Sequence, residues 1–323
     1  MVTAIRVSHT GAPDVMSVEQ VEAQAPIEGL VWVEQEAIGV NFLDVTQRNG
    51  TVPMRIPSGL GYEGAGRVTA VGPGVASVRV GDRVGYATGP IGAYASGRLY
   101  PADRLVLLPD ELSATDAAAI LFKGVTAQYL IKSTHPVGPG SIIVLYGVTG
   151  GLGQIMTPWA KRLGAVVIGV VAKESDIDLA KTLGCDAAFV STSDLPAKVA
   201  EFTAGKKADV VYDPIGRATF EMSLDCLHSR GTMVSFGASS GAVPAVSVDT
   251  LNAKGSLYLT RPSIFAYTVD ASECRQRAED VLSACTAGII KPSVWKTFPL
   301  ADVAAAHTAM ESGKSSGAIV LTT

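Results

Sequence analysis

The sequence predicts an α/β protein made of a β-rich domain and a doubly wound domain with a parallel sheet. Three observations predict it. Apolar strands alternate with helices from about residue 124, the first of these strands leads through glycines into a helix, and residues 1 to about 120 carry short apolar stretches separated by glycine and proline turns. A chain of 323 residues is also long enough to form two cores rather than one.

Turn residues define the elements of the β-rich part. Strands are expected at 68–71 and 83–86, separated by a segment that contains Gly81 and other turn formers. Towards the end of this part, Ser113 is followed three residues later by Asp116 and then by an alanine-rich run. That pattern predicts the beginning of a helix.

The doubly wound part shows a regular alternation of apolar strands and helices. The expected strands are 142–146, 166–171, 187–190, 209–213 and 232–236. The expected helices lie near 153–163, 176–183, 195–203 and 217–228. Since helices that connect parallel strands pack on the sheet, this order predicts a sheet covered on both faces.

After about residue 260 the alternation stops. A polar helix is expected at 271–287, a second helix near 302–311 and a final strand at 318–322. We expect this tail to return to the first domain. The expected domains are therefore 1–123 with 265–323, and 124–264.

A glycine-rich loop after the first parallel strand is the most informative feature. It contains Gly147, Gly150, Gly151 and Gly153, with Leu152 before the last of them. Glycines allow the backbone to approach a phosphate, and the helix that follows presents free N–H groups and the positive end of its dipole. The pattern predicts a dinucleotide pyrophosphate site, and so a nicotinamide enzyme. Its spacing differs from G-x-G-x-x-G, and a tight turn in another kind of α/β protein is the alternative.

Composition argues against several classes of function. The net charge is −4 and no basic block occurs, which makes nucleic-acid binding an unfavourable interpretation. The apolar runs are too short to span a membrane, and the N-terminus lacks the pattern of a signal peptide. The four cysteines show no paired spacing, which indicates reduced thiols. We therefore expect a cytoplasmic protein with a small-molecule substrate.

A set of short motifs runs through the chain in a fixed order. They are Gly39–Asp44, Pro57–Gly66, Gly81–Val84, Lys123–Thr126, Gly150–Gly153, Val211–Asp213, Ser223–Leu227, Met233–Gly237 and Gly255–Pro262. Together they resemble the medium-chain dehydrogenase/reductase superfamily, and within it the zinc-independent NADPH:quinone oxidoreductases of the zeta-crystallin-like branch. The resemblance implies a GroES-like catalytic domain, a Rossmann domain, NADPH as cofactor and hydride transfer to a quinone or conjugated carbonyl.

The same motifs imply that zinc is not used. Zinc-dependent relatives carry a cysteine where this chain has Asn41 and a histidine where it has Tyr62. A catalytic zinc requires about three Cys, His or carboxylate ligands, and Glu63 alone does not supply them. Without a metal to polarise the substrate, the acceptor must take a hydride readily, as quinones and activated enones do.

The resemblance places Asn41, Asp44 and Tyr62 in the catalytic site, with Asn41 also close to the nicotinamide ribose. The amide of Asn41 is expected to donate a hydrogen bond to the acceptor oxygen. The alternatives are structural: Asn41 caps a turn, Asp44 accepts local backbone N–H groups, and Tyr62 packs in the core. Arg48, one helical turn after Asp44, is expected to pair with it.

Further cofactor contacts are implied outside the glycine loop. Lys123 and Thr126 are expected on the nicotinamide side, where the two domains meet, and a solvated lysine at a helix end is the alternative for Lys123. Phe236, Gly237 and Ser239 follow the end of an expected strand, where open α/β sheets bind ligands. A plain turn is the alternative there.

The choice between NADPH and NADH depends on the end of the second parallel strand. NAD enzymes place an acidic residue there, whereas this chain has Ala172 and Lys173, which favours NADPH. The family positions that hold the 2′-phosphate are changed, so Lys173, Lys314 and Ser191 are expected to serve instead. NADH, bound through Glu174, is the alternative.

A second resemblance predicts how copies of the chain assemble. Residues 251–261 resemble the edge strand through which family members pair about a two-fold axis, so a homodimer is expected.

The identity of the acceptor stays open at this point. Val52 stands where quinone reductases usually carry a tyrosine, so the acceptor pocket is expected to be less aromatic. The alternatives to quinone reduction are reduction of an enone or enoyl double bond, and a non-catalytic, NADPH-binding role like that of the crystallin and RNA-associated relatives. The acidic net charge argues against the RNA-associated role.

Overall fold

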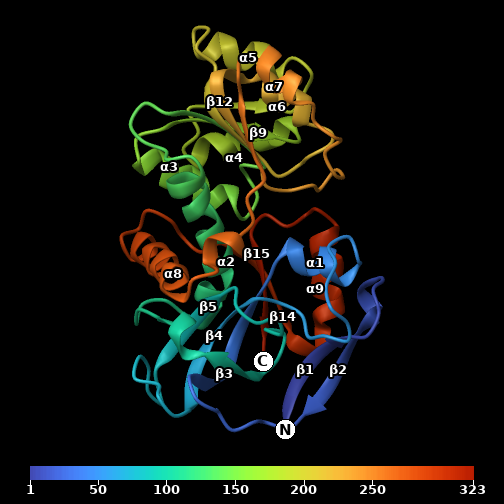
Figure 1. Cartoon of the computed structure of the whole chain (residues 1–323), viewed down its shortest axis with the longest axis vertical. Coiled ribbons are helices and arrows are strands. Elements are labelled where there is room, and N and C mark those ends of the chain that lie inside the picture. The colour runs from blue at the N-terminus through green and yellow to red at the C-terminus, as the bar shows by residue number, and fades with distance from the viewer. The chain divides into compact units, whose positions relative to one another are not determined.

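The computed structural model describes residues 1–323 and contains two compact units (Figure 1). The first unit is Met1–Val125 together with Tyr267–Thr323, and the second is Thr126–Ala266. The sequence predicts these divisions after residue 123 and before residue 265. The β-rich first unit and the α/β second unit confirm the predicted fold class.

The first unit contains a mixed seven-stranded sheet and a separate two-stranded hairpin. Its strands are β1 (Val2–Val7), β2 (Met16–Val21), β3 (Leu30–Val40), β4 (Glu63–Val71), β5 (Arg83–Ala87), β6 (Gly97–Pro101), β7 (Val106–Leu107), β14 (Val294–Pro299) and β15 (Ala318–Thr322). The sheet order is β14-β15-β3-β4-β5-β7, and β6 also pairs with β3. Val320 of β15 lies opposite Gly39 of β3, so the end of the chain completes the sheet that its beginning forms.

The helices of the first unit are α1 (Phe42–Arg48), α8 (Ala271–Thr286) and α9 (Val303–Glu311), and α2 (Ala114–Tyr129) crosses from the first unit into the second. As predicted, α2 begins after Ser113, whose hydroxyl accepts the backbone N–H of Asp116 at 3.0 Å. Along β3 the residues first alternate between exposed and buried and are then all buried from 37 to 40. The strand therefore ends inside the unit and leads directly into α1.

The second unit contains a six-stranded, fully parallel sheet of order β10-β9-β8-β11-β12-β13. Its strands are β8 (Ile142–Tyr146), β9 (Val166–Val171), β10 (Ala187–Val190), β11 (Ala208–Asp213), β12 (Leu227–Ser235) and β13 (Tyr258–Thr260). Its helices are α3 (Gly153–Arg162), α4 (Ile177–Thr182), α5 (Leu195–Phe202), α6 (Phe220–Asp225) and α7 (Val248–Ala253). Successive residues of β9, such as Val167 and Ile168, are both buried, so helices or loops cover both faces of this sheet.

The direction in which successive strands are added to the sheet reverses between the neighbouring parallel strands β8 and β11. From β8 the sheet proceeds through β9 and β10 on one side, and through β11, β12 and β13 on the other. This is the strand order of a doubly wound Rossmann domain, in which ligands bind beyond the carboxyl ends of the strands at the reversal point.

One predicted element is wrong. The segment 251–261 is not a continuous strand, because α7 occupies Val248–Ala253 and only Tyr258–Thr260 pairs with β12. The hydroxyl of Ser247 accepts the N–H of Asp249 and caps this helix. Gly255, at φ +110°, then turns the chain into the short strand. The helix expected near 217–228 is also shorter, since α6 ends at Asp225 and β12 begins at Leu227.

The helices were also compared with the requirements of a membrane span, which are length and apolar character. No helix in the structure combines the length and the apolar character needed to cross a membrane.

Candidate functional site

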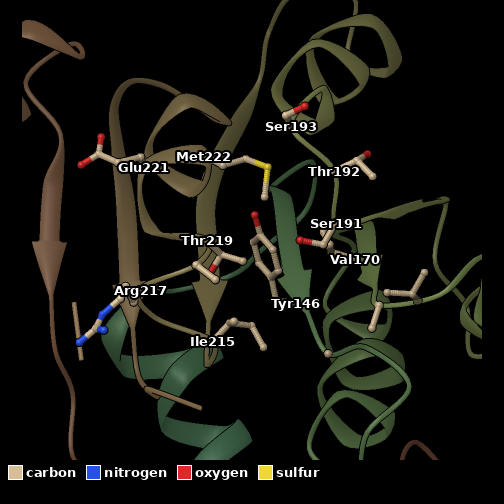
Figure 2. A pocket seen from close by; sticks show the side chains of 14 residues that line it. Tyr146, Val170, Ser191, Thr192, Ser193, Ile215, Arg217, Thr219, Glu221 and Met222 are labelled. Atoms are coloured by element: carbon tan, nitrogen blue, oxygen red, sulfur yellow. The ribbon is translucent and has the colours of Figure 1, made fainter. Parts of the chain in front are cut away.

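A pocket of about 620 Å³ lies at the carboxyl ends of the central strands of the second unit. It includes the reversal point, because Tyr146 ends β8 and Ile215 follows β11. The lining residues are Tyr146, Gly147, Val170, Val171, Ala172, Ser191, Thr192, Ser193, Ile215, Arg217, Ala218, Thr219, Glu221 and Met222. Figure 2 shows Tyr146 in the middle, with Ser191 and Thr192 on one side and Thr219 and Met222 on the other.

One buried carboxylate fixes the wall of this pocket after β11. Asp213 is fully buried, and its Oδ1 accepts the backbone N–H groups of Ile215 at 2.7 Å and Gly216 at 3.1 Å. Its Oδ2 accepts the hydroxyls of Thr219 at 2.7 Å and Ser223 at 2.8 Å. Four hydrogen bonds to one side chain hold the loop and the start of α6 in place, so this wall of the pocket is preformed.

The glycines of the loop occupy their positions for different structural reasons. Gly147 lines the pocket, adopts φ +65° and donates its N–H to the carbonyl of Val170 at 3.0 Å. Gly150 is less crowded than Gly153, since an added Cβ would meet a single atom within 4 Å, the Gly147 carbonyl oxygen at 3.3 Å. Gly153 is a packing glycine, because a Cβ there would lie 2.3 Å from the carbonyl oxygen of Val148. Leu152 is the N-cap residue of α3.

The predicted 2′-phosphate residues occupy three different places. Ser191 lines the pocket, and its N–H bonds to the carbonyl of Val171 at 2.9 Å. Lys173 is exposed, two residues beyond the end of β9, and does not line the pocket. Lys314 belongs to the first unit, where it is exposed in the segment after α9. The structure therefore brings only Ser191 into the pocket.

The predicted segment after β12 is held by backbone contacts. Phe236 donates its N–H to the carbonyl of Asp213 at 3.0 Å, and Ser239 donates to the carbonyl of Pro214 at 3.3 Å. A Cβ at Gly237 would lie 2.2 Å from the carbonyl oxygen of Pro214. The close backbone approach that Gly237 indicates is thus an approach of the neighbouring loop. Thr126 is half-buried in the last turn of α2.

In the first unit, a polar network lies where β3 ends and α1 begins. Asn41 is 4 % exposed, and its side-chain Nδ2 donates to Oε2 of Glu63 at 2.9 Å. Its Oδ1 accepts a hydrogen bond from Nζ of Lys123 at 2.9 Å. Glu63 is fully buried and also accepts the backbone N–H of Phe122 through Oε1 at 2.6 Å. Burial raises the pKa of Glu63, and the ammonium of Lys123 opposes that rise.

A second series of hydrogen bonds begins at Asp44. Its Oδ2 accepts the backbone N–H of Asn41 at 2.8 Å and the hydroxyl of Tyr94 at 2.9 Å. The Tyr94 hydroxyl lies 3.0 Å from Nε2 of His307, which is fully buried. Burial is the main cause that raises the pKa of Asp44 to about 7 and lowers the pKa of His307 to about 3. A neutral His307 therefore donates from Nε2 to Tyr94, and Tyr94 donates to Asp44.

Tyr62 and Arg48 have structural partners. The Tyr62 hydroxyl accepts Nε2 of Gln47 at 3.0 Å, and the Tyr62 side chain is mostly buried. The expected pairing of Arg48 with Asp44 is wrong. Arg48 instead binds the carboxylate of Glu311 at 2.7 Å, because its side chain extends towards α9.

Two glycines of the predicted motifs make room for buried polar side chains, Gly39 for the Glu63 carboxylate and Gly64 for the Gln35 amide. A Cβ at Gly39 would lie 2.0 Å from Oε2 of Glu63 and 2.2 Å from the carbonyl oxygen of Ala118. A Cβ at Gly64 would lie 2.2 Å from Oε1 of Gln35. No group of three or more His, Cys, Asp or Glu side chains is placed to hold a metal ion.

Sequence reasoning missed residues in both units. In the first unit it assigned no role to Tyr94, which contacts Asp44 across 50 residues of chain, or to His307, which contacts Tyr94 across 213. In the second unit it missed several pocket residues. These are Tyr146, Thr192, Ser193, Arg217, Thr219 and Met222. Their position immediately after parallel strands, or at the start of the next helix, is the signal that indicates them.

Two family models match this chain. The model described as alcohol dehydrogenase GroES-like domain matches residues 28–110, and the model described as zinc-binding dehydrogenase matches residues 151–284.

Full-length similarity extends these matches. The chain is 42% identical to 2-haloacrylate reductase from a Burkholderia species over 330 residues, covering 99% of each chain. It is 41% identical to quinone oxidoreductase 1 of Escherichia coli over 325 residues, again covering 99% of each. Among solved structures, Escherichia coli quinone oxidoreductase complexed with NADPH superposes with a TM-score of 0.95 and 40% identity, over 99% of this chain and 100% of the other.

Proposed function

Because this chain belongs to the quinone oxidoreductase family of the medium-chain dehydrogenase/reductase superfamily, we propose that it is a zinc-independent NADPH:quinone oxidoreductase. The observation that carries the proposal is the 41% sequence identity to a quinone oxidoreductase over 99% of each chain. A preformed pocket at the reversal point of the parallel sheet accompanies it. That pocket is where a doubly wound domain binds a nucleotide.

The residues of the second unit fit the nucleotide. We assign the pyrophosphate to the Gly147–Gly153 loop, because Gly150 has no side chain, only one atom lies within 4 Å of the place of its Cβ, and the N-terminus of α3 suits a phosphate group. The adenosine is assigned to the pocket lined by Tyr146, Ser191 and Thr219. Lys173 of this unit and Lys314 of the first unit are the candidates for the 2′-phosphate, since both are exposed cations.

The nicotinamide end is assigned to four further groups. These are Asn41, Lys123, Thr126, and the Phe236–Ser239 segment with Gly237. When bound, the reduced nicotinamide supplies a hydride to the acceptor. The protein residues orient the two reactants and exclude water, which is the main contribution that such a reaction needs from the protein.

The acceptor is assigned to the polar network of the first unit, where Asn41, Asp44 and Tyr62 are the proposed catalytic-site residues. Each oxygen of Glu63 accepts one hydrogen bond, Oε2 from Asn41 and Oε1 from the Phe122 N–H, so Glu63 serves as a hydrogen-bond acceptor in this network. A quinone spreads the incoming negative charge over a conjugated system, and this residue set suits such an acceptor.

A second candidate function follows from the 42% identity to 2-haloacrylate reductase over 99% of each chain. That relative's name describes reduction of an acrylate, which is an activated carbon–carbon double bond. The same hydride donor serves both reactions, so the two candidates differ only in the acceptor.

The deciding experiment measures the loss of nicotinamide absorbance with NADPH and NADH in parallel. The acceptors are 1,4-benzoquinone, 9,10-phenanthrenequinone and 2-chloroacrylate, each with and without EDTA. EDTA-resistant quinone turnover with NADPH supports the quinone reductase. Turnover of 2-chloroacrylate alone favours the second candidate, and nucleotide binding without any turnover contradicts both.

We further propose a homodimer in the cytoplasm. β13 has a neighbour on one side only, and its Tyr258 is exposed, so this edge is suited to pairing with a second copy. The four cysteines are all free thiols, which supports a reducing compartment.

A further inference from the structure

Lys123 is the cation that faces the buried carboxylates of the first unit. Its Nζ donates to Oδ1 of Asn41 at 2.9 Å and lies 3.4 Å from the carbonyl oxygen of Val40. Its positive charge lowers the pKa of both Asp44 and Glu63, against the effect of burial. The ammonium is therefore anchored by an amide, a backbone carbonyl and two nearby carboxyl groups.

These contacts leave the Lys123 ammonium one further N–H group that can donate a hydrogen bond. An ammonium has three N–H donors, and the structure uses two of them, on Asn41 and Val40. Asn41 and Glu63 are buried, whereas Lys123 is only half-buried. The third N–H thus belongs to the most accessible member of the network.

Asn41 is poorly placed for the role that the sequence suggests. Its Oδ1 accepts from Lys123 and its Nδ2 donates to Glu63, so the amide connects two protein groups. Glu63 is itself fixed by the N–H of Phe122, the residue next to Lys123 in α2. Glu63 therefore fixes the Asn41 amide, and the Asn41 amide fixes the position of the Lys123 ammonium.

We propose that Lys123 is the catalytic electrophile, donating a hydrogen bond from its ammonium to the acceptor oxygen, with Asn41 and Glu63 as positioning residues. This inference rests on the proposed function and names the group that acts on its substrate. The hydride brings two electrons and one proton to the acceptor, and the negative charge moves to the acceptor oxygen. Lys123 keeps its proton and stabilises this charge, and water supplies the proton that completes the product.

The test compares Lys123→Met and Lys123→Arg with Lys291→Met, a control at an exposed lysine of the same unit. Loss of one such donor lowers kcat by about 10²- to 10³-fold. We expect that loss in Lys123→Met, a smaller loss in Lys123→Arg and none in Lys291→Met. The Kd of NADPH, measured by fluorescence titration, should rise by a much smaller factor than kcat falls. An unchanged kcat with a raised Kd of NADPH would make Lys123 a ribose contact and overturn the proposal.

A second measurement does not depend on turnover. p-Nitrophenol is titrated in the presence of protein and NADP⁺, and its ionisation is followed by the visible absorbance of the phenolate. A nearby ammonium lowers the pKa of the bound phenol, so we expect a lowered pKa with wild-type protein and with Lys291→Met. The shift should disappear in Lys123→Met, and its absence from the wild-type protein would overturn the proposal.

The two proposals fail in different ways. Wild-type protein that oxidises NADPH with none of the acceptors contradicts the proposed function, whereas the phenol titration still reports on Lys123. Circular dichroism melting identifies a variant that does not fold, and Lys123→Gln, which keeps a polar group without the charge, then replaces Lys123→Met.

Discussion

At the scale of single residues, Gly150 and Gly153 separate a ligand requirement from a packing requirement. An alanine at Gly150 would meet only the Gly147 carbonyl oxygen at 3.3 Å, and Gly150 does not adopt a positive φ. We predict that Gly150→Ala folds normally but binds NADPH about tenfold more weakly, equivalent to about 1.4 kcal/mol, because the methyl group enters the space of the pyrophosphate. Thermal melting and fluorescence titration measure the two properties separately.

Gly153→Ala is the matched comparison. Its Cβ would lie 2.3 Å from the carbonyl oxygen of Val148, so the backbone of the loop must move. We predict a stability loss on the order of 1–3 kcal/mol, as for other overpacked sites. Wild-type nucleotide affinity in Gly150→Ala would remove the loop from the proposed nucleotide site.

The raised pKa of Asp44 predicts that the stability of the folded protein depends on pH. Its pKa is about 7 in the folded protein and 3.8 when unperturbed, so between these values the folded state holds a proton that the unfolded state releases. The free energy of unfolding therefore falls as the pH rises from about 4 to about 7, by on the order of 4 kcal/mol. Asp44→Asn cannot ionise and can still accept from Asn41 and Tyr94, so it should lack this fall.

The measurement is the difference in unfolding free energy between Asp44→Asn and wild type, from urea titrations at several pH values. The difference should grow in favour of the variant up to about pH 7 and then stay constant. His307 has the opposite effect, because its pKa is lowered to about 3 and stability then rises with pH between about 3 and 6.5. Comparing two proteins that both contain His307 isolates the contribution of Asp44. A difference that is flat from pH 4 to 8 would contradict the raised pKa.

At the scale of elements, the parallel strands were the most predictable parts of the chain. β8, β9 and β10 begin and end at the predicted residues, because each is an apolar run with a polar or glycine residue within two positions of either end. The segment 251–261 misled the prediction, because the cap at Ser247 and the turn at Gly255 are local features that a resemblance to a strand does not reveal.

The candidate site was predictable only in part. Asn41, Asp44 and Lys123 were indicated by motifs, and the structure brings them into one network. Glu63 was considered only as a metal ligand, and its bonds to Asn41 and Phe122 join segments 22 and 59 residues away. Contacts of this length depend on how the sheet folds, so local pattern does not predict them.

The loop after β9 gives a prediction about cofactor choice. Lys173 is exposed at the start of the short helix Glu174–Asp176, beyond the end of β9. If it binds the 2′-phosphate, Lys173→Ala should raise the Kd of NADPH about tenfold and leave the Kd of NADH unchanged, because a charge-assisted hydrogen bond contributes about 1.5 kcal/mol or more. Fluorescence titration with both nucleotides measures the ratio, and Lys206→Ala, at another exposed lysine, is the control. Equal changes for the two nucleotides would place the phosphate elsewhere.

At the scale of the whole molecule, the two units carry different chemistry. The second unit holds a preformed pocket whose wall Asp213 fixes, and the first unit holds the buried carboxyl, amide and ammonium groups. The first unit is assembled from both ends of the chain, and the second is one continuous segment inserted between them. A deletion that removes β15 is therefore expected to disrupt the same sheet as a deletion that reaches β3, because these two strands pair although they come from opposite ends of the chain.

The open edge of the second unit gives the last prediction, which concerns assembly. Tyr258 is 62 % exposed on β13, an edge strand. In a dimer formed edge to edge about a two-fold axis, each position of the interface meets its counterpart or a near neighbour, so Tyr258→Glu would bring two carboxylates close together. We predict that wild-type protein elutes with twice the chain mass of 33.4 kDa and that this variant elutes as a single chain. Val80→Glu, at an equally exposed apolar residue of the first unit, should leave the dimer intact. Light scattering after size exclusion distinguishes the outcomes: a variant that remains dimeric excludes this edge as the interface, and a monomeric wild type excludes the dimer itself.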